Sequence, residues 1–133
     1  MLGQGRIETG EMADDMELMQ RAGLFIRNAR RLKLHNVEVT GQLGPALMLN
    51  DSADVDLSAS TTHTPCPDAP VIRMSNVDGA FVHGCQASAE TGVFLQLQGE
   101  NTKGIVFSGN HLAQAGQAIQ ITGDVPTAAI IIN

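Results

Sequence analysis

The feature that most constrains the fold is an asparagine or aspartate that returns at nearly constant intervals. Successive copies are separated by 23, 25, 25 and 23 residues. These anchor residues are Asn28, Asp51, Asn76, Asn101 and Asp124. A fixed period in the twenties is typical of a solenoid, because each repeat forms one coil that cannot bury its apolar side chains alone. The sequence therefore predicts a stack of similar coils.

Each copy of the repeat also carries apolar residues at the fourth and sixth positions after the anchor. They are Leu32 and Leu34, Val55 and Leu57, Ala80 and Val82, Ile105 and Phe107, and Ala128 and Ile130. In the first copy, Leu24 and Ile26 precede the anchor, and Val37 and Val39 follow a bend at Asn36. Such alternation with polar residues is the period-2 pattern of a strand. The bend recurs at Ala59, Gly84 and Gly109. We therefore expect three short strands per coil.

The charged residues support parallel stacking of these coils, although they did not define the repeat. Equivalent residues of adjacent parallel strands lie about 4.8 Å apart. This register places opposite charges over one another in three pairs, which are Arg31 and Asp54, Lys33 and Asp56, and Asp78 and Lys103. Opposite charges in neighbouring strands are favourable, whereas like charges are not. Strand crossovers are almost always right-handed, so the expected fold is a right-handed parallel β-helix.

We therefore expect residues 1–133 to form a single all-β domain, with residues 23–133 making about five coils. Residues 1–22 form an N-terminal edge or cap in this interpretation. Met12, Met16 and Met19 have helical spacing, and Gly23 could end such a helix. An irregular strand-and-loop edge is the alternative. A cap of either kind would cover the apolar end of the first coil.

Composition argues against several partners. The chain has no Trp, no Tyr and four Phe, and its net charge is −6. A nucleic-acid partner is not expected, because binding would require a basic surface or a stacking platform. No apolar run is long enough to span a membrane. The start of the sequence lacks the apolar stretch of a signal peptide, so we expect a cytoplasmic chain or one whose leader or larger N-terminal part is removed.

Cysteines and histidines do not predict a metal site or a cofactor. Cys66 and Cys85 do not make a disulfide framework, and the inward position of Cys85 predicts a buried free thiol. His35 and His83 share an outward column but lie two coils apart, about 10 Å, which is too far to share a metal. No nucleophile motif or phosphate-binding loop is present.

The anchor residues have two interpretations. Carboxylates and amides can bind calcium. Asn and Asp also tolerate left-handed backbone conformations and hydrogen-bond their own turns. The second property favours a structural turn ladder, an Asn ladder running along the solenoid axis.

Several stretches resemble the C-terminal coils of polygalacturonase-like enzymes. They are AGLFIRNA followed by residues 32–37, then PALMLNDSADVDL, PVIRMSNVDGAFVHGC and TGVFLQLQGENTKGIVFSGNHL, and together they span roughly residues 12–125. These enzymes are family 28 glycoside hydrolases within the pectin-lyase-like β-helix superfamily. The resemblance implies hydrolysis of galacturonan-type polysaccharides and an extracellular or periplasmic location. The family's catalytic Asn-x-Asp, Gly-Asp-Asp, Gly-His-Gly and Arg-Ile-Lys motifs are absent from this chain.

In the family, the active cleft lies on the outer face of the strand before the first turn. The corresponding positions here are Phe25 and Arg27, Met48 and Asn50, Arg73 and Ser75, and Gln96 and Gln98. Glycoside hydrolysis requires two placed carboxylates, and these positions supply none. The chain is therefore expected to be a non-catalytic module from, or related to, a polysaccharide-degrading enzyme. Arg27 and Arg73 could pair with sugar carboxylates of an acidic polysaccharide, and Gln96 and Gln98 could bind its hydroxyls.

Two alternatives remain open at the level of sequence. An intact small hydrolase or lyase could use loop carboxylates such as Asp14, Asp15 and Glu17. An assembly protein could instead associate through its C-terminal coil, where Ala128–Asn133 ends without a polar cap. That end of the solenoid is expected to be covered by another chain or by residues that a longer protein would supply.

Overall fold

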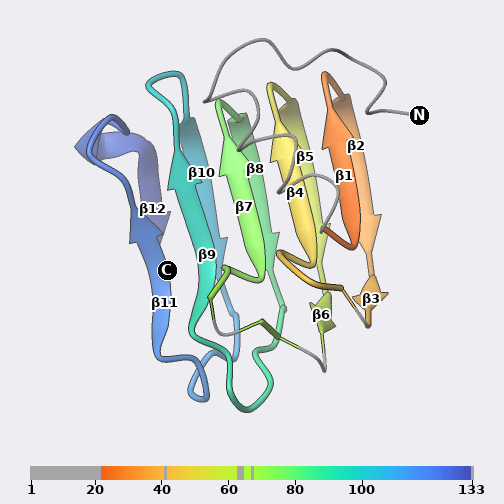
Figure 1. Ribbon diagram of the computed structural model, residues 1–133. Helices are drawn as coiled ribbons and strands as arrows, with labels where there is room; N and C mark the ends of the chain where they lie inside the picture. Colours follow the sequence, from red (N-terminus) through yellow and green to blue (C-terminus); the bar gives the residue numbers. More distant parts are fainter. Residues whose placement is uncertain (1–21, 41, 63–64, 67, 133) are drawn as a thin grey trace, which may run out of the picture.

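The computed structural model describes residues 22–40, 42–62, 65–66 and 68–132, which form a parallel β-solenoid of about four turns. The two main sheets face one another across the core (Figure 1). Sheet A contains β1 (Leu24–Arg27), β4 (Leu47–Asn50), β7 (Ile72–Ser75), β9 (Val93–Gln98) and β11 (Gln117–Ile121). Sheet B contains β2 (Arg30–His35), β5 (Ala53–Ser58), β8 (Asp78–His83), β10 (Lys103–Ser108) and β12 (Ile130–Ile132).

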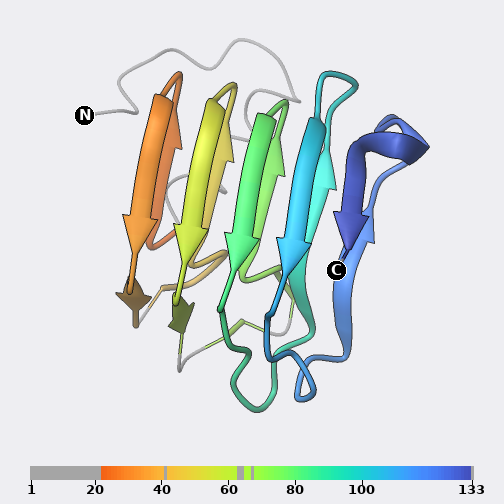
Figure 2. The same ribbon diagram turned by 180° about the vertical axis from the view of Figure 1, so that it is seen from behind.

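All strand pairs in these sheets are parallel, as the charge columns predict. Seen from behind, the strands of sheet B descend while the chain advances from β2 to β12, so the winding is right-handed (Figure 2). Lys33 is the register partner of Asp56, and Lys103 is the partner of Asp78. The Lys103 Nζ and Asp78 Oδ2 atoms are 3.9 Å apart.

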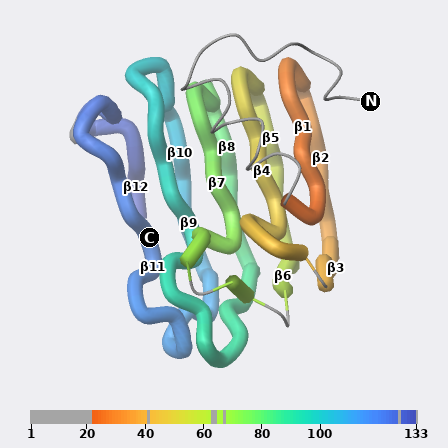
Figure 3. Tube along the Cα trace, viewed as in Figure 1, coloured from red at the N-terminus to blue at the C-terminus, as the bar shows by residue number. Residues whose placement is uncertain are grey.

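The third strand of each coil is shorter than the repeat predicts. Among the described residues, only β3 (Glu38–Val39) and β6 (Thr61–Thr62) pair as strands here, and the next two coils retain one bridge, between Gln86 and His111. Loops occupy this end of the later coils, as the Cα trace shows (Figure 3). The methionine-rich N-terminal cap lies outside the described residues.

Residues with a left-handed backbone conformation stack from coil to coil in three columns. Of the positive-φ residues in the described ranges, only Glu90 lies outside these columns. The first column is Asn28, Asp51, Asn76 and Gly99; the second is Arg31, Asp54, Gly79 and Gly104; the third is Asn36, Ala59, Gly84 and Gly109. The third column is the bend that the sequence predicts. Asn, Asp and Gly suit such positions because they tolerate positive φ at low steric cost.

Toward the C-terminus, the first column differs from the anchor positions that the sequence predicts. Gln98 pairs with Ser75, so Gly99 follows Asn76 in the stack, and Asn101 lies two residues farther along a longer turn. The Asn76 Oδ1 atom accepts a hydrogen bond from the Asn101 amide at 3.2 Å. Asp124 accepts instead from Thr122 Oγ1 at 2.7 Å, and this bond lowers the pKa of the Asp124 carboxyl.

The last coil is also shifted by two residues. Ile130 pairs with Ile105, and Ile132 pairs with Phe107, whereas the repeat predicts Ala128 and Ile130 at these positions. The residues between β11 and β12 include a 3₁₀ turn, η1 (Thr127–Ala129), which lengthens this connection. About four turns therefore form in place of the five predicted coils.

Where the chain turns from one sheet to the other, buried hydroxyl groups form hydrogen bonds with backbone amides and carbonyls. Ser52 Oγ accepts from the Ala29 amide and donates to the Asn50 carbonyl. Thr102, which is fully buried, likewise bonds the Val77 amide and the Gln98 carbonyl. Each such hydroxyl ties one coil to the next, because donor and acceptor belong to adjacent coils.

We expect Thr102→Val to lower the free energy of unfolding by about 1–3 kcal/mol. The valine keeps the shape of the side chain but leaves the Val77 amide and the Gln98 carbonyl without their hydroxyl partner. Urea denaturation followed by circular dichroism measures the change. A loss below about 0.5 kcal/mol would show that these groups find other partners.

Candidate functional site

The outer face of sheet A holds the residues that the sequence predicts to contact a ligand. Its first outward column is Phe25, Met48, Arg73, Gln96 and Gln120, and its second is Arg27, Asn50, Ser75 and Gln98. Each column crosses the coils along the solenoid axis. The described residues of both columns include no carboxylate, whereas glycoside hydrolysis requires a pair of acids.

The two halves of this face differ in chemistry. Met48 is 1% exposed and packs against Ala22 and Phe25. The half beginning at Arg73 is polar and only half-buried. Met48 therefore lies on the outward side of the sheet without being exposed, and its contact with Phe25 and Ala22 is apolar.

Arg73, Gln96 and Gln98 lie together on this polar half. Arg73 Nη2 donates to Gln98 Oε1 at 2.6 Å, which fixes the orientation of the guanidinium relative to the next coil. Gln96 Nε2 donates to Gln120 Oε1 at 2.6 Å, one coil farther. The result is a row of guanidinium and carboxamide groups that spans three coils. We name these four residues, Arg73, Gln96, Gln98 and Gln120, the polar row.

Arg27 is not part of the polar row. It is exposed and lies in the same column as Gln98, but Asn50 and Ser75 stand between them. The Asn50 Oδ1 and Ser75 Oγ atoms are buried and lack a hydrogen-bond partner in the described part of the chain. Because solvent does not reach these two atoms, Arg27 is separated from the polar row along its column.

Sequence reasoning missed Gln120 because the last coil has an irregular spacing. It also missed two hydrogen-bonded pairs on the outer face of sheet B. His83 Nε2 lies 2.7 Å from Asp56 Oδ1, and His35 Nδ1 lies 2.8 Å from Ser58 Oγ. Ser58 is the register partner of both histidines, so the strand alignment could have indicated this cluster.

The sheet B cluster does not assemble a catalytic triad. No hydrogen bond joins the two pairs within the described residues, and the imidazole that contacts Ser58 is not the one that contacts Asp56. The His83 and Asp56 side chains are 34% and 41% exposed, so their contact contributes about 1 kcal/mol or less to stability. These contacts are best explained as links between neighbouring coils.

Neither cysteine forms a disulfide, and Cys85 is fully buried, as the repeat predicts. Burial raises the pKa of the Cys85 thiol, and hydrogen bonds from the Ser60 and Ala59 backbone oppose only part of that effect. A buried neutral thiol is a poor nucleophile. The described residues contain no group of three or more His, Cys, Asp or Glu side chains suited to hold a metal ion.

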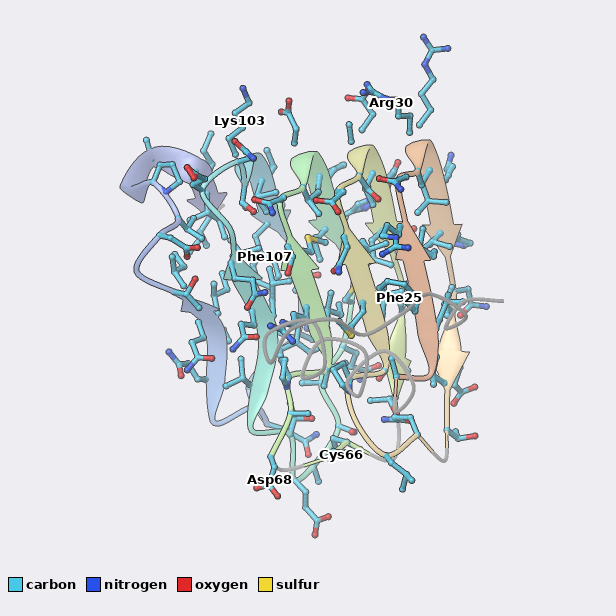
Figure 4. The ribbon with its side chains drawn as sticks, turned by 45° about the horizontal axis from the view of Figure 1, so that its top comes forward. Phe25, Arg30, Cys66, Asp68, Lys103 and Phe107 are labelled. Carbon is cyan, nitrogen blue, oxygen red and sulfur yellow. The ribbon has the colours of Figure 1, made fainter. Side chains whose placement is uncertain are left out.

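Figure 4 shows the turn end of the solenoid, where Arg30 and Lys103 project away from the sheets. These two residues belong to one column with Ala53 and Asp78. An open depression of about 230 Å³ lies there beside Asp51, Asn76 and Asn101. Its acidic members are exposed, and Asp78 pairs with Lys103, so the described geometry favours solvated turns over a cation site.

Comparisons with known proteins add no family assignment. No family model, curated protein or solved structure matches this chain. The similarity to polygalacturonase-like enzymes therefore depends on the quoted sequence stretches alone, and the structure supports its β-helix fold only. Among the described residues, no helix is both long enough and apolar enough to cross a membrane.

Proposed function

We propose that this β-solenoid is a non-catalytic module, belonging to or derived from a pectin-degrading glycoside hydrolase, that binds an acidic polysaccharide through the polar row of sheet A. The observation that carries the proposal is the oriented guanidinium of Arg73. Gln98 fixes it from the next coil at 2.6 Å, and the described residues of the two outward columns include no carboxylate. A planar guanidinium recognises a carboxylate through paired N–H donors.

The shape of the row suits an extended polymer. Its side chains follow the solenoid axis, and neighbouring coils repeat at about 4.8 Å. Gln96 and Gln120 present carboxamides, which can both donate to and accept from sugar hydroxyls. The absence of Trp and Tyr removes the usual aromatic stacking surfaces, so polar contacts would have to supply the affinity. A weak, salt-sensitive interaction is the consequence.

The test is a titration of ¹⁵N-labelled protein with galacturonic acid oligomers at low salt. We expect resonance shifts at Arg73, Gln96 and Gln98, and an affinity that falls at least about tenfold in Arg73→Gln, because a charged hydrogen bond is lost. Arg30→Gln is the matched control, since it removes the same charge from the turn end of the solenoid.

A second control uses the same oligomers with their carboxyls methyl-esterified. The natural protein should bind these neutral oligomers more weakly than the acidic ones. The Arg73→Gln variant should bind the neutral and the acidic oligomers with equal affinity. An absence of shifts at the polar row would contradict the proposal. An equal loss of affinity in Arg30→Gln would also contradict it, because the interaction would then follow net charge and not the site.

The catalytic alternative depends on Asp14, Asp15 and Glu17, which lie outside the described residues. Cleavage of pectic substrates that is lost in Asp15→Asn would favour that alternative over a binding module.

A further inference from the structure

In the last coil that the structure describes, the edge strands of both sheets carry exposed apolar side chains. β11 and β12 are the outermost strands of sheets A and B, at the end opposite to β1 and β2 (Figure 3). Ile121 is 43% exposed and Ile132 is 65% exposed, although the equivalent residues one coil earlier, Leu97 and Phe107, are buried. Ile131 on the outer side of β12 is 56% exposed.

The opposite edge is chemically different. Arg30, Arg31 and Lys33 are exposed on β2, the first strand of sheet B. Lys33 belongs to the same column as Ile131, which runs through Asp56, Phe81 and Val106. Charged residues on an edge strand oppose pairing with another chain, whereas an apolar edge invites it. The outward column of sheet B therefore begins with a charged side chain on β2 and ends with an apolar one on β12.

This difference selects one arrangement of two copies. Head-to-tail stacking would continue the parallel sheets but would place Lys33 of one copy against Ile131 of the next. Within the chain, by contrast, Lys33 stacks on Asp56. Tail-to-tail stacking brings isoleucines against isoleucines and keeps Arg30, Arg31 and Lys33 out of the interface. Rotation about a two-fold axis reverses the strand direction, so the two edges would pair as antiparallel strands.

We propose that two copies of this protein associate tail to tail through β11 and β12. The interface is the same surface on both copies, so assembly closes at the dimer and does not continue into a filament. Ile119 and Ile130, which are half-buried at this end of the core, become part of a continuous apolar interior across the interface.

Analytical ultracentrifugation over a wide concentration range tests the proposal. The protein should reach twice its 14.0 kDa mass and no more. Ile131→Lys introduces on β12 the same residue type that Lys33 supplies on β2. In the proposed dimer, the two introduced lysines would face each other across the interface. It should raise the dimer dissociation constant more than about tenfold. Phe81→Lys is the matched control, because it removes a 42% exposed side chain from the same column two coils inside the stack.

Three outcomes would overturn the proposal. The first is a monomer at all concentrations, whether the edge is inert or further chain covers it. The second is a mass that grows without limit, which indicates head-to-tail assembly. The third is equal dissociation by Phe81→Lys, which would place the contact on the outer face of sheet B. The natural protein's mass decides the first two outcomes even if a variant does not fold.

Discussion

Leu97→Ala is expected to lower the free energy of unfolding by about 2–5 kcal/mol. Leu97 is fully buried in β9, with Met74 on one side and Ile121 on the other along its column. Truncation leaves a cavity between two coils, and the strand hydrogen bonds on both sides prevent the coils from closing it. Because the chain has no Trp or Tyr, the measurement is urea denaturation followed by circular dichroism.

Ile121→Ala is the matched control for this prediction. It removes a side chain of the same size from the same column, in the next coil toward the C-terminus, where the residue is already 43% exposed. We expect a loss of no more than about 1.5 kcal/mol. Equal losses at the two positions would contradict the observed order of burial. A larger loss at Ile121 would suggest that the last coil is covered in solution.

Gly99→Ala is expected to destabilise the protein by at least about 2 kcal/mol. Gly99 has φ +96°, a conformation that L side chains rarely adopt. A Cβ atom there would overlap the Asn76 Oδ1 and Cγ atoms of the preceding coil and come within 2.9 Å of its backbone nitrogen. The strain is therefore both local and between coils.

Two further variants separate those contributions. Gly109 has a similar positive φ of 64°, but a Cβ atom there would have nothing within 4 Å, so Gly109→Ala should cost only about 1 kcal/mol. Asn76→Gly combined with Gly99→Ala removes the side chain that clashes. If the coils stack as described, the double variant should be less destabilised than the sum of the single variants by more than about 0.5 kcal/mol. Strict additivity would argue against that contact.

Much of the fold could be predicted because a parallel stack repeats its requirements at fixed positions. Apolar pairs such as Leu57 and Val82, and left-handed positions such as Asn36 and Gly84, recur at the period of the coil. The errors arose where the period changes. The longer turn at Gly99–Thr102 was hidden because Asn101 keeps the anchor's spacing, although Gly99 takes the left-handed conformation.

The candidate site was less predictable for a physical reason. Register places Arg73, Gln96 and Gln98 on one face, but it does not determine which side chains bond across the coils. The Arg73–Gln98 bond joins diagonal neighbours, and the Gln96–Gln120 bond depends on an irregular last coil. Nor does the alternation of apolar and polar residues reveal that Met48, on the outward side of the sheet, is buried and packs against Phe25 and Ala22.

The most direct test of the account is to measure which residues face one another across the coils, because the polar row, the glycine contact and the apolar edge all depend on that register. Nuclear Overhauser effects in methyl-labelled protein should connect Leu49 to Met74 and Met74 to Leu97, each pair separated by one coil. They should also connect Leu57 to Val82, and Val82 to the ring protons of Phe107 in a sample whose Phe rings stay protonated. Contacts in an antiparallel order, or shifted by one residue so that Met48 replaces Leu49, would contradict the stacked register.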